Sequence, residues 1–288
     1  MQHALSTHII ANHRLTTVWL ERIWDAGIPA VEIFCARQHL DYTNRAQIAE
    51  LYHFFRDSEL RLHSLHAPLY TDEVWGRSGP NAVLSITEIV KKRRVAVVDE
   101  LKRALEIAER IPFRYFIQHI GTAGEEFDEH KVEAAFTCLE EISLFARQRG
   151  VEVLLENIPN GFSSAERLDY FLHQTHLDLG YCFDLGHAHM NEGIDAAFEI
   201  MQARIRSTHV HDNNGTVDAH LVPFHPEGSI DWRRAMRLLS SRPEQYPLLL
   251  ELREREPDPH PLEEVCRTFE QLENLIDDER TESAEDNH

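Results

Sequence analysis

One segment of the chain, STHVHDNNGTVDAHLVPFHPEG at 207–228, is crowded with side chains that can bind metals or move protons. It contains His209, His211, His220 and His225 together with Asp212 and Asp218. A buried strand rarely contains so many polar groups unless a partner binds them, because a polar group that is removed from water without a new hydrogen-bond partner costs free energy. The segment could be a metal site, a catalytic acid–base array or a solvated loop, and the elements around it must decide between the three.

The elements that would position this segment are short apolar strands and longer amphipathic helices, which alternate along the chain. Candidate strands lie at 7–11, 30–36, 60–67, 114–121, 151–158, 179–186, 206–213 and 247–254. Helical patterns lie at 15–27, 45–59, 132–150 and 262–278, and Gly27 and Gly150 stand where helix ends favour glycine. Eight strand–helix units in 288 residues predict an α/β protein with a single-domain (β/α)8 TIM-barrel fold. An open, doubly wound sheet is the main alternative.

The acids and histidines fall at the C-terminal ends of the expected strands, whereas the first part of most strands is apolar. Taken from the third strand to the eighth, they are His63 and His66, His119, Glu156, Asp184 and His187, His209 and His211, and Glu251. In a (β/α)8 barrel these ends converge on one face. A lone histidine at such a place is usually structural, but six consecutive strands with such residues predict a cluster, and buried carboxylates require a compensating cation. Mixed nitrogen and oxygen donors favour Zn²⁺, Mn²⁺, Co²⁺ or Fe²⁺ over Ca²⁺.

Distinct motifs accompany four of these strands: ENIPNG at 156–161, DLGHAHM at 184–190, HVHDNNG at 209–215 with DAHL at 218–221, and LLLELRE at 248–254. Together they resemble the xylose isomerase-like superfamily of TIM barrels, which includes sugar-phosphate isomerases and epimerases and endonuclease IV. The resemblance covers essentially the whole chain. It implies a barrel over 1–277 with a metal site at the C-terminal strand ends, and it implies the metal ligands Glu156, Asp184, His209 and Glu251.

The resemblance also implies a reaction. In the epimerases of this group two metal-bound glutamates flank the substrate carbon, so that one removes a proton and the other returns it; here they would be Glu156 and Glu251. The function expected is therefore a metal-dependent isomerase or epimerase acting on a sugar or sugar phosphate, with one to three divalent ions (Mn²⁺, Zn²⁺, Co²⁺ or Mg²⁺). His187 matches a family position that contacts substrate or an additional metal.

Two other reactions stay open at this point. A phosphodiester hydrolase similar to endonuclease IV would use further metals, and the resemblance supplies the ligand sets His66, His119 and Glu156 for one ion and His187, Asp218 and His220 for another. The net charge of −20 and the absence of basic duplex-contacting loops argue against a nucleic-acid substrate. A metal-dependent dehydratase or lyase acting on a keto-sugar or polyol is the other alternative.

Substrate contacts are expected from two regions near the rim. Glu32 on the second strand matches a position that touches sugar hydroxyls, although it could instead pair with Arg37. The irregular segment at 70–85 is long enough to cover a site. Within it, Trp75 could stack on a sugar ring and Arg77 could bind a phosphate.

The cysteines, the apolar runs and the charged segments indicate the cellular environment of the protein. The four cysteines are scattered, which predicts reduced thiols in a cytoplasmic protein. The chain has no apolar run long enough to span a membrane, and a secretory signal is not expected. The basic run at 91–103 is interpreted as one solvated helix face, and the acidic residues 278–288 as a disordered tail. The sequence leaves the oligomeric state open, with a homo-oligomer compatible with the resemblance.

Overall fold

The computed structural model describes residues 1–254 and 260–285, with the side chains of residue 81 and residues 277–285 excepted. Its strands are β1 (His3–Ser6), β2 (Ala30–Phe34), β3 (Arg61–His66), β4 (Tyr115–His119), β5 (Glu152–Glu156), β6 (Gly180–Asp184), β7 (Ile205–His209) and β8 (Leu248–Leu250). They form one parallel sheet in the order β7-β6-β5-β4-β3-β2-β1-β8. A parallel bridge between Val210 and Leu250 joins its two edges. The (β/α)8 barrel predicted from the sequence is therefore confirmed.

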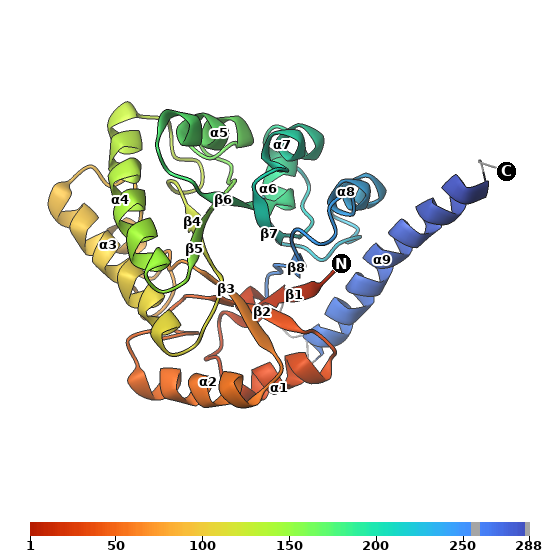
Figure 1. Cartoon of the computed structure of the whole chain (residues 1–288), viewed down its shortest axis with the longest axis horizontal. Coiled ribbons are helices and arrows are strands. Elements are labelled where there is room, and N and C mark those ends of the chain that lie inside the picture. The colour runs from red at the N-terminus through yellow and green to blue at the C-terminus, as the bar shows by residue number, and fades with distance from the viewer. Residues whose placement is uncertain (255–259, 286–288) are drawn as a thin grey trace.

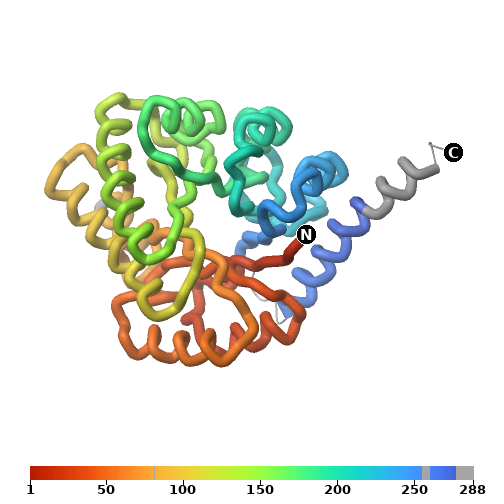
Figure 2. Tube along the Cα trace, viewed as in Figure 1, coloured from red at the N-terminus to blue at the C-terminus, as the bar shows by residue number. Residues whose placement is uncertain are grey.

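Helices surround this barrel (Figure 1). They are α1 (Thr17–Asp25), α2 (Arg45–Asp57), α3 (Lys91–Leu105), α4 (Glu129–Arg147), α5 (Ala165–Gln174), α6 (Leu185–Met190), α7 (Ile194–Met201), α8 (Trp232–Leu239) and α9 (Pro261–Glu285), with 3-10 turns at Thr7–Ile10, Gly79–Ala82 and Glu106–Glu109. Gly27 and Gly150 follow α1 and α4 with positive φ angles, as their helix-ending role requires. Figure 2 shows the N-terminal strand beside α9, where the rings of His3 and Phe269 stack at 4.1 Å.

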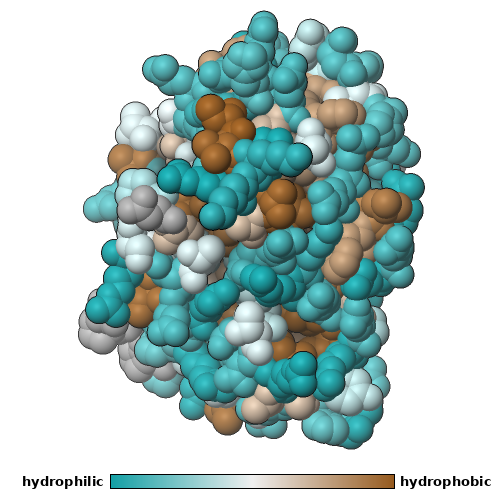
Figure 3. Space-filling model, turned by 90° about the vertical axis from the view of Figure 1, so that its left-hand side faces the viewer, coloured by the Kyte–Doolittle hydropathy of each residue, from teal (hydrophilic) through white to brown (hydrophobic). Residues whose placement is uncertain are grey.

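The basic segment at 91–103 forms most of α3, as expected. Its lysines and arginines face solvent, while Val97, Val98 and Leu101 are buried under it. The face of the molecule that carries α3 and α4 is accordingly hydrophilic with scattered hydrophobic residues (Figure 3). The tail expected at 278–288 falls on positions whose side chains lie outside the described residues. Among the described residues, no helix is long and apolar enough to cross a membrane.

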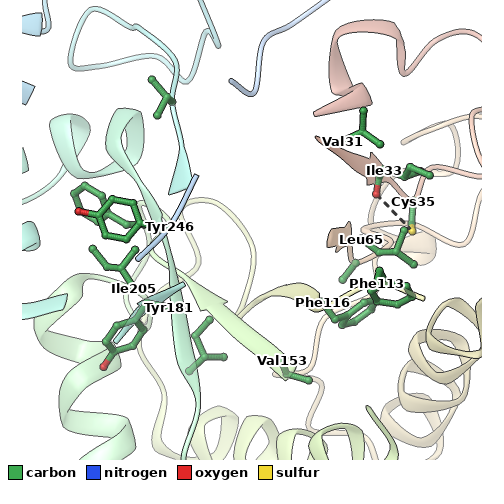
Figure 4. Packing of buried hydrophobic residues seen from close by; sticks show 14 of the residues in the cluster. Val31, Ile33, Cys35, Leu65, Phe113, Phe116, Val153, Tyr181, Ile205 and Tyr246 are labelled. Atoms are coloured by element: carbon green, nitrogen blue, oxygen red, sulfur yellow. Dashed lines mark hydrogen bonds between the residues drawn. The ribbon is translucent and has the colours of Figure 1, made fainter. Parts of the chain in front are cut away.

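Side chains of the strands alternate between two buried environments. Those that point outward pack beneath the helices and include Val31, Ile33, Leu65 and Phe116 on one side of the barrel and Tyr181 and Ile205 on another (Figure 4). Those that point inward form a smaller apolar cluster of Tyr115, Ile117, Leu154 and Cys182. Because both faces of a parallel strand are buried, only the strand ends are free to carry chemistry.

The first strand differs from its prediction. The apolar run at 7–11 is a 3-10 turn, Thr7–Ile10, and the strand is the preceding His3–Ser6. Register explains the shift, since His3, Ala4 and Leu5 pair with the three residues of β8. The Ser6 hydroxyl accepts a hydrogen bond from the His8 amide at the start of the turn. The prediction of a strand at 7–11 is therefore wrong, and the run is apolar because Ile9 and Ile10 belong to the core.

Candidate metal centre

Four buried donors meet at the C-terminal end of the barrel. They come from β5, β6, β7 and the residue after β8: Glu156, Asp184, His209 and Glu251. One ligand atom from each lies within 4.8 Å of all the others. The Nδ1 atom of His209 lies 3.1 Å from a Glu156 carboxylate oxygen and 3.3 Å from a Glu251 oxygen. This is the quartet that the sequence resemblance implied.

Strand parity explains why these four side chains converge. Glu156 is two residues beyond Leu154, and Asp184 is two beyond Cys182, so each carboxylate shares the inward direction of an apolar residue in the barrel. Asp184 also begins α6, because its Oδ1 accepts a hydrogen bond of 2.6 Å from the His187 amide. The acid therefore has one oxygen fixed by the helix start and the other facing the quartet.

Glu32 lies beneath the quartet rather than in the pocket above it. It is fully buried, accepts a hydrogen bond from the Ser64 hydroxyl at 2.7 Å and lies 3.1 Å from the Nε2 atom of His209. A carboxylate at that nitrogen fixes the ring so that Nδ1 faces the other donors. Glu32 does not line that pocket, and Arg37 pairs with Glu100 instead of with Glu32.

A second group of donors shares Glu156 with the quartet. The Nε2 atoms of His119 and His66 lie 2.9 and 3.5 Å from its Oε2 atom. His66, His119 and Glu156 each offer an atom to this group within the same 4.8 Å limit. This matches the second ligand set expected from the sequence.

A third group contains one residue more than expected. His187, Asp218 and His220 are joined by His211, which the sequence placed at a strand end but did not assign to a metal. The residue that makes room for His211 is Gly186, because a Cβ atom at this position would lie 2.1 Å from the His211 ring. Glycine at that position leaves room for an imidazole, so the two residues belong together.

The histidines of these groups are held by their other ring nitrogen. The Nδ1 atoms of His66, His187 and His220 each lie 2.9 to 3.0 Å from a backbone carbonyl oxygen, those of Ala67, Asn157 and Glu251. An N–H that donates to a carbonyl leaves the lone pair of Nε2 free for a cation. His220 also has a φ of 45°, a left-handed conformation that is costly for a residue other than glycine and is typical of functional sites.

Opposed charges shift the titration of these groups. Burial on its own would lower the pKa of His209, but the surrounding acidic groups, including Glu251 and Glu32, raise that pKa well above its ordinary value. Burial would raise the pKa of Glu156, yet His209 and His119 hold it well below the ordinary range. In the third group, burial would lower the pKa of His220, but Asp218 raises it to about 9. Metal binding to such groups displaces protons.

Three buried atoms make the case for a cation independently of charge. Asp184 Oδ2, His211 Nε2 and Asp218 Oδ1 have no hydrogen-bond partner within the described part of the chain. Buried polar atoms are normally paired, and each unpaired one costs about 1 to 3 kcal/mol. All three belong to the donor groups above. The donor sets therefore fit one or more divalent cations, with nitrogen and oxygen ligands suited to Zn²⁺ or Mn²⁺.

A pocket of about 300 Å³ opens above the donors. Trp75 forms part of its wall and packs on Phe34 at 4.9 Å and on His8 at 5.7 Å. Tyr70 lines it too, so the segment at 70–85 does border the site. Arg77 of the same segment is exposed and does not line this pocket.

Sequence reasoning missed two residues of this pocket, His8 and Arg253. His8 is buried, and its Nδ1 has no partner among the described residues. It stands in the run that was taken for a strand, which concealed it. Arg253 lies two residues after Glu251, and its amide donates to the His220 carbonyl, so the strand end places it at the pocket.

Two other polar residues have structural roles. The Asp212 carboxylate accepts hydrogen bonds from the amides of Asn213 and Ser229 and from the Trp232 indole N–H, so it holds the loop after β7 together. His63, expected at the rim, lies instead toward the N-terminal end of the barrel, 3.2 Å from the Ser207 hydroxyl.

Comparison with known families gives one match over most of the chain. A family model described as xylose isomerase-like TIM barrel matches residues 20–273. Among curated proteins, uncharacterized protein MJ1614 of Methanocaldococcus jannaschii is 24% identical over 161 residues, which are 55% of this chain and 59% of that protein. Uncharacterized protein MJ1311 of the same organism is 28% identical over 233 residues, 77% of this chain and 74% of that protein.

Solved structures share the whole fold. A D-tagatose 3-epimerase-like protein superposes with a TM-score of 0.76 at 22% identity, covering 98% of this chain and 100% of that one. The IOLI protein with a binding zinc atom gives 0.75 at 17% identity, covering 96% and 98%. The 3-keto-D-glucoside 4-epimerase YcjR from E. coli gives 0.73 at 14% identity, covering 95% and 99%. At these identities the likeness is one of fold.

Proposed function

The chain belongs to the xylose isomerase-like TIM-barrel family, and from that premise we propose that it is a divalent-metal-dependent isomerase or epimerase of a sugar or sugar phosphate. The observation that carries this proposal is the quartet of Glu156, Asp184, His209 and Glu251. Two of its members are glutamates that reach the same histidine from strands on either side of it.

The two glutamates suit a proton exchange. Glu156 comes from β5 and Glu251 from the end of β8, so their carboxylates approach the centre from different directions. One carboxylate can take a proton from a substrate carbon, and the other can return it on the opposite side. A divalent cation bound here supplies stabilisation of the negative charge that develops on the neighbouring carbonyl oxygen.

The relatives agree with this class of reaction. Two of the similar structures are a D-tagatose 3-epimerase-like protein and a 3-keto-D-glucoside 4-epimerase. A third similar structure holds zinc. These names support a carbohydrate substrate and a metal ion, while the sugar and the stereocentre follow only from assay.

Solvent-deuterium exchange into a panel of ketoses and sugar phosphates tests the proposal, because it reports proton removal even where the overall equilibrium is unfavourable. We expect exchange with the purified protein and its metal, and a loss of about a thousandfold or more in Glu156→Gln, since the residue both holds the cation and moves the proton. Glu166→Gln, an exposed glutamate on α5, is the matched control and should keep full exchange. Full turnover of Glu156→Gln would overturn the mechanism.

The second and third donor groups favour a second candidate, a multi-metal phosphodiester hydrolase. His66 and His119 on one side, and His187, His211 and His220 on the other, could hold two further ions around the shared centre. Metal analysis separates the candidates, with about one ion per chain expected for the epimerase and up to three for the hydrolase. Cleavage of a duplex with an abasic site would establish the hydrolase. Product analysis of the same sugar panel would detect a dehydratase or lyase as loss of water or carbon–carbon cleavage.

A further inference from the structure

The opposite end of the barrel contains a cavity of about 550 Å³ that the proposed function does not use. It is lined where strands begin, by Arg61 at the start of β3, Arg114 just before β4 and Arg206 on β7. His63 also borders it, together with apolar and amide side chains near β8. Three arginines at one cavity are unexpected in a chain of net charge −20.

Two irregularities in the sheet bring polar residues to this cavity. Val31 pairs with Leu62 but Glu32 pairs with Ser64, so His63 is an extra residue in β3. In the same way Tyr181 pairs with Ile205 but Cys182 with Ser207, which makes Arg206 an extra residue in β7. A bulge re-aims the side chain of its extra residue and is usually a functional feature. The two bulges meet, since the His63 ring contacts the Ser207 hydroxyl at 3.2 Å.

The three arginines have no acidic partner. Elsewhere arginines pair with carboxylates, as Arg149 does with Glu109 and Arg204 with Asp178. No ion pair formed within the described part of the chain includes Arg61, Arg114 or Arg206.

Two of the arginines contact an aromatic ring or backbone carbonyls, and the Glu152 carboxylate lies close to the Arg206 side chain. Arg114 lies over the Tyr115 ring at 5.2 Å, and Arg206 donates to the backbone carbonyls of Ala203 and Ile205. Glu244 is the acidic residue that lines the cavity.

His63 adds an imidazole to the cavity lining. Burial, together with the charges of Arg114 and Arg61, lowers the pKa of His63 to about 4, although Glu32 opposes the shift. The imidazole is therefore neutral at pH 7 and adds a polar ring without adding a charge. What the cavity requires is a ligand that brings negative charge and several acceptor oxygens.

We propose that this cavity is a second binding site, for a phosphate group, at the N-terminal end of the barrel. Guanidinium groups match phosphate because their planar array of N–H donors forms paired, charge-assisted hydrogen bonds with its oxygens. Arg61, Arg114 and Arg206 reach the cavity from three different strand starts, so they can contact different oxygens of one group. The phosphate can be inorganic or part of a small monoester, and both present the same chemistry to the arginines.

Calorimetric titration of the metal-loaded protein with inorganic phosphate and with methyl phosphate, a monoester that carries no sugar, tests the site. We expect saturable binding that weakens about tenfold or more in Arg114→Gln/Arg206→Gln, because two charge-assisted contacts are lost. Arg114→Lys/Arg206→Lys, which keeps the charge but not the planar donor array, should be intermediate. Arg45→Gln, at an exposed arginine at the start of α2, removes one positive charge elsewhere and should bind as the unaltered protein does.

Further arms separate this site from the metal centre and from folding defects. Glu156→Gln should leave the affinity unchanged, so failure of the sugar reaction would not affect this result. Arg61→Gln, at an exposed strand start, gives a folded variant if the double substitution lowers the melting temperature. Tighter binding of the monoester identifies a phosphorylated metabolite as the ligand, and equal affinity identifies free phosphate. No saturable binding, equal weakening in Arg45→Gln, or loss in Glu156→Gln would each overturn the proposal.

Discussion

The middle and the C-terminal end of the barrel interior differ in chemistry although the same strands build both. In the middle, Leu154, Ile117 and Cys182 pack against one another, and two residues further along the same three strands stand Glu156, His119 and Asp184. A step of two residues keeps the side-chain direction and moves only along the barrel axis. The apolar residues that stabilise the barrel and the donors that could bind metal therefore occupy adjacent layers. A substitution in one layer should change the stability or the metal content without changing the other.

Gly186→Ala should have the largest combined effect, on stability and on metal content together, since it forces a Cβ atom against the His211 ring at 2.1 Å. Overpacking of this kind costs about 3 kcal/mol, and we expect the third donor group to lose metal as well. Chemical denaturation and metal analysis would measure both. The double variant Gly186→Ala/His211→Ala removes the clash, so it should recover stability but not the metal. Equal instability in the double variant would contradict the assignment of the clash to His211.

Leu154→Ala tests the apolar layer. Leu154 is fully buried, and its truncation leaves a cavity inside the barrel. A loss of about 2 to 5 kcal/mol in the free energy of unfolding is expected, with metal content unchanged. If metal content fell in step with stability, the two layers would not be separable.

Glu32→Gln should have a moderate effect on the donors alone. The substitution keeps the shape but removes the charge that faces His209 Nε2. Loss of such a supporting carboxylate lowers metal affinity about 10- to 100-fold. Competition with a fluorescent chelator measures the change. Glu100→Gln is the matched control, because Glu100 is also buried but pairs with Arg37 and belongs to none of the donor groups. It should lower stability without changing affinity.

His39→Gln should have the smallest effect at pH 7, and its main effect should be on the pH dependence of stability. Burial lowers the pKa of His39 to about 4, where its ring contacts Thr7 and the His13 carbonyl. The folded state therefore favours the neutral ring, whose contribution is complete above pH 6.5 and is lost as pH falls toward 4. As pH falls from 6.5 to 4, the free energy of unfolding of the unaltered protein should therefore decrease by up to about 3 kcal/mol more than that of the variant. Parallel stability curves would contradict this.

Much of the fold could be predicted because it depends on local patterns. Alternating apolar runs placed seven of the eight strands, and the acids and histidines at their ends predicted a cluster at one end of the barrel. The choice of Glu156, Asp184, His209 and Glu251 within that cluster depended on the family resemblance. The first strand could not be placed in this way. Its limits are set by pairing with β8, a partner some 240 residues away, while its own residues are less apolar than the turn that follows.

The supporting residues were harder to foresee. Glu32 could be read as a pocket residue because its depth in the barrel depends on the bulge in β3, which no local pattern reveals. His211 follows His209, the last residue of β7, by two positions, so the sequence alone does not show that the two rings belong to different donor groups. The space beside Gly186, which the His211 ring occupies, separates them. Arg77 belongs to a loop whose course decides which of its side chains reaches the pocket.

The start of α6 connects local folding to the centre of the molecule. Asp184 receives the His187 amide with one oxygen, while its other oxygen is buried without a partner in the described residues. A cation on that second oxygen would stabilise the helix start, by the ordinary thermodynamic linkage between binding and folding. Amide hydrogen exchange at the beginning of α6 would then slow on metal loading and serve as a spectroscopic gauge of occupancy, readable before any substrate is known.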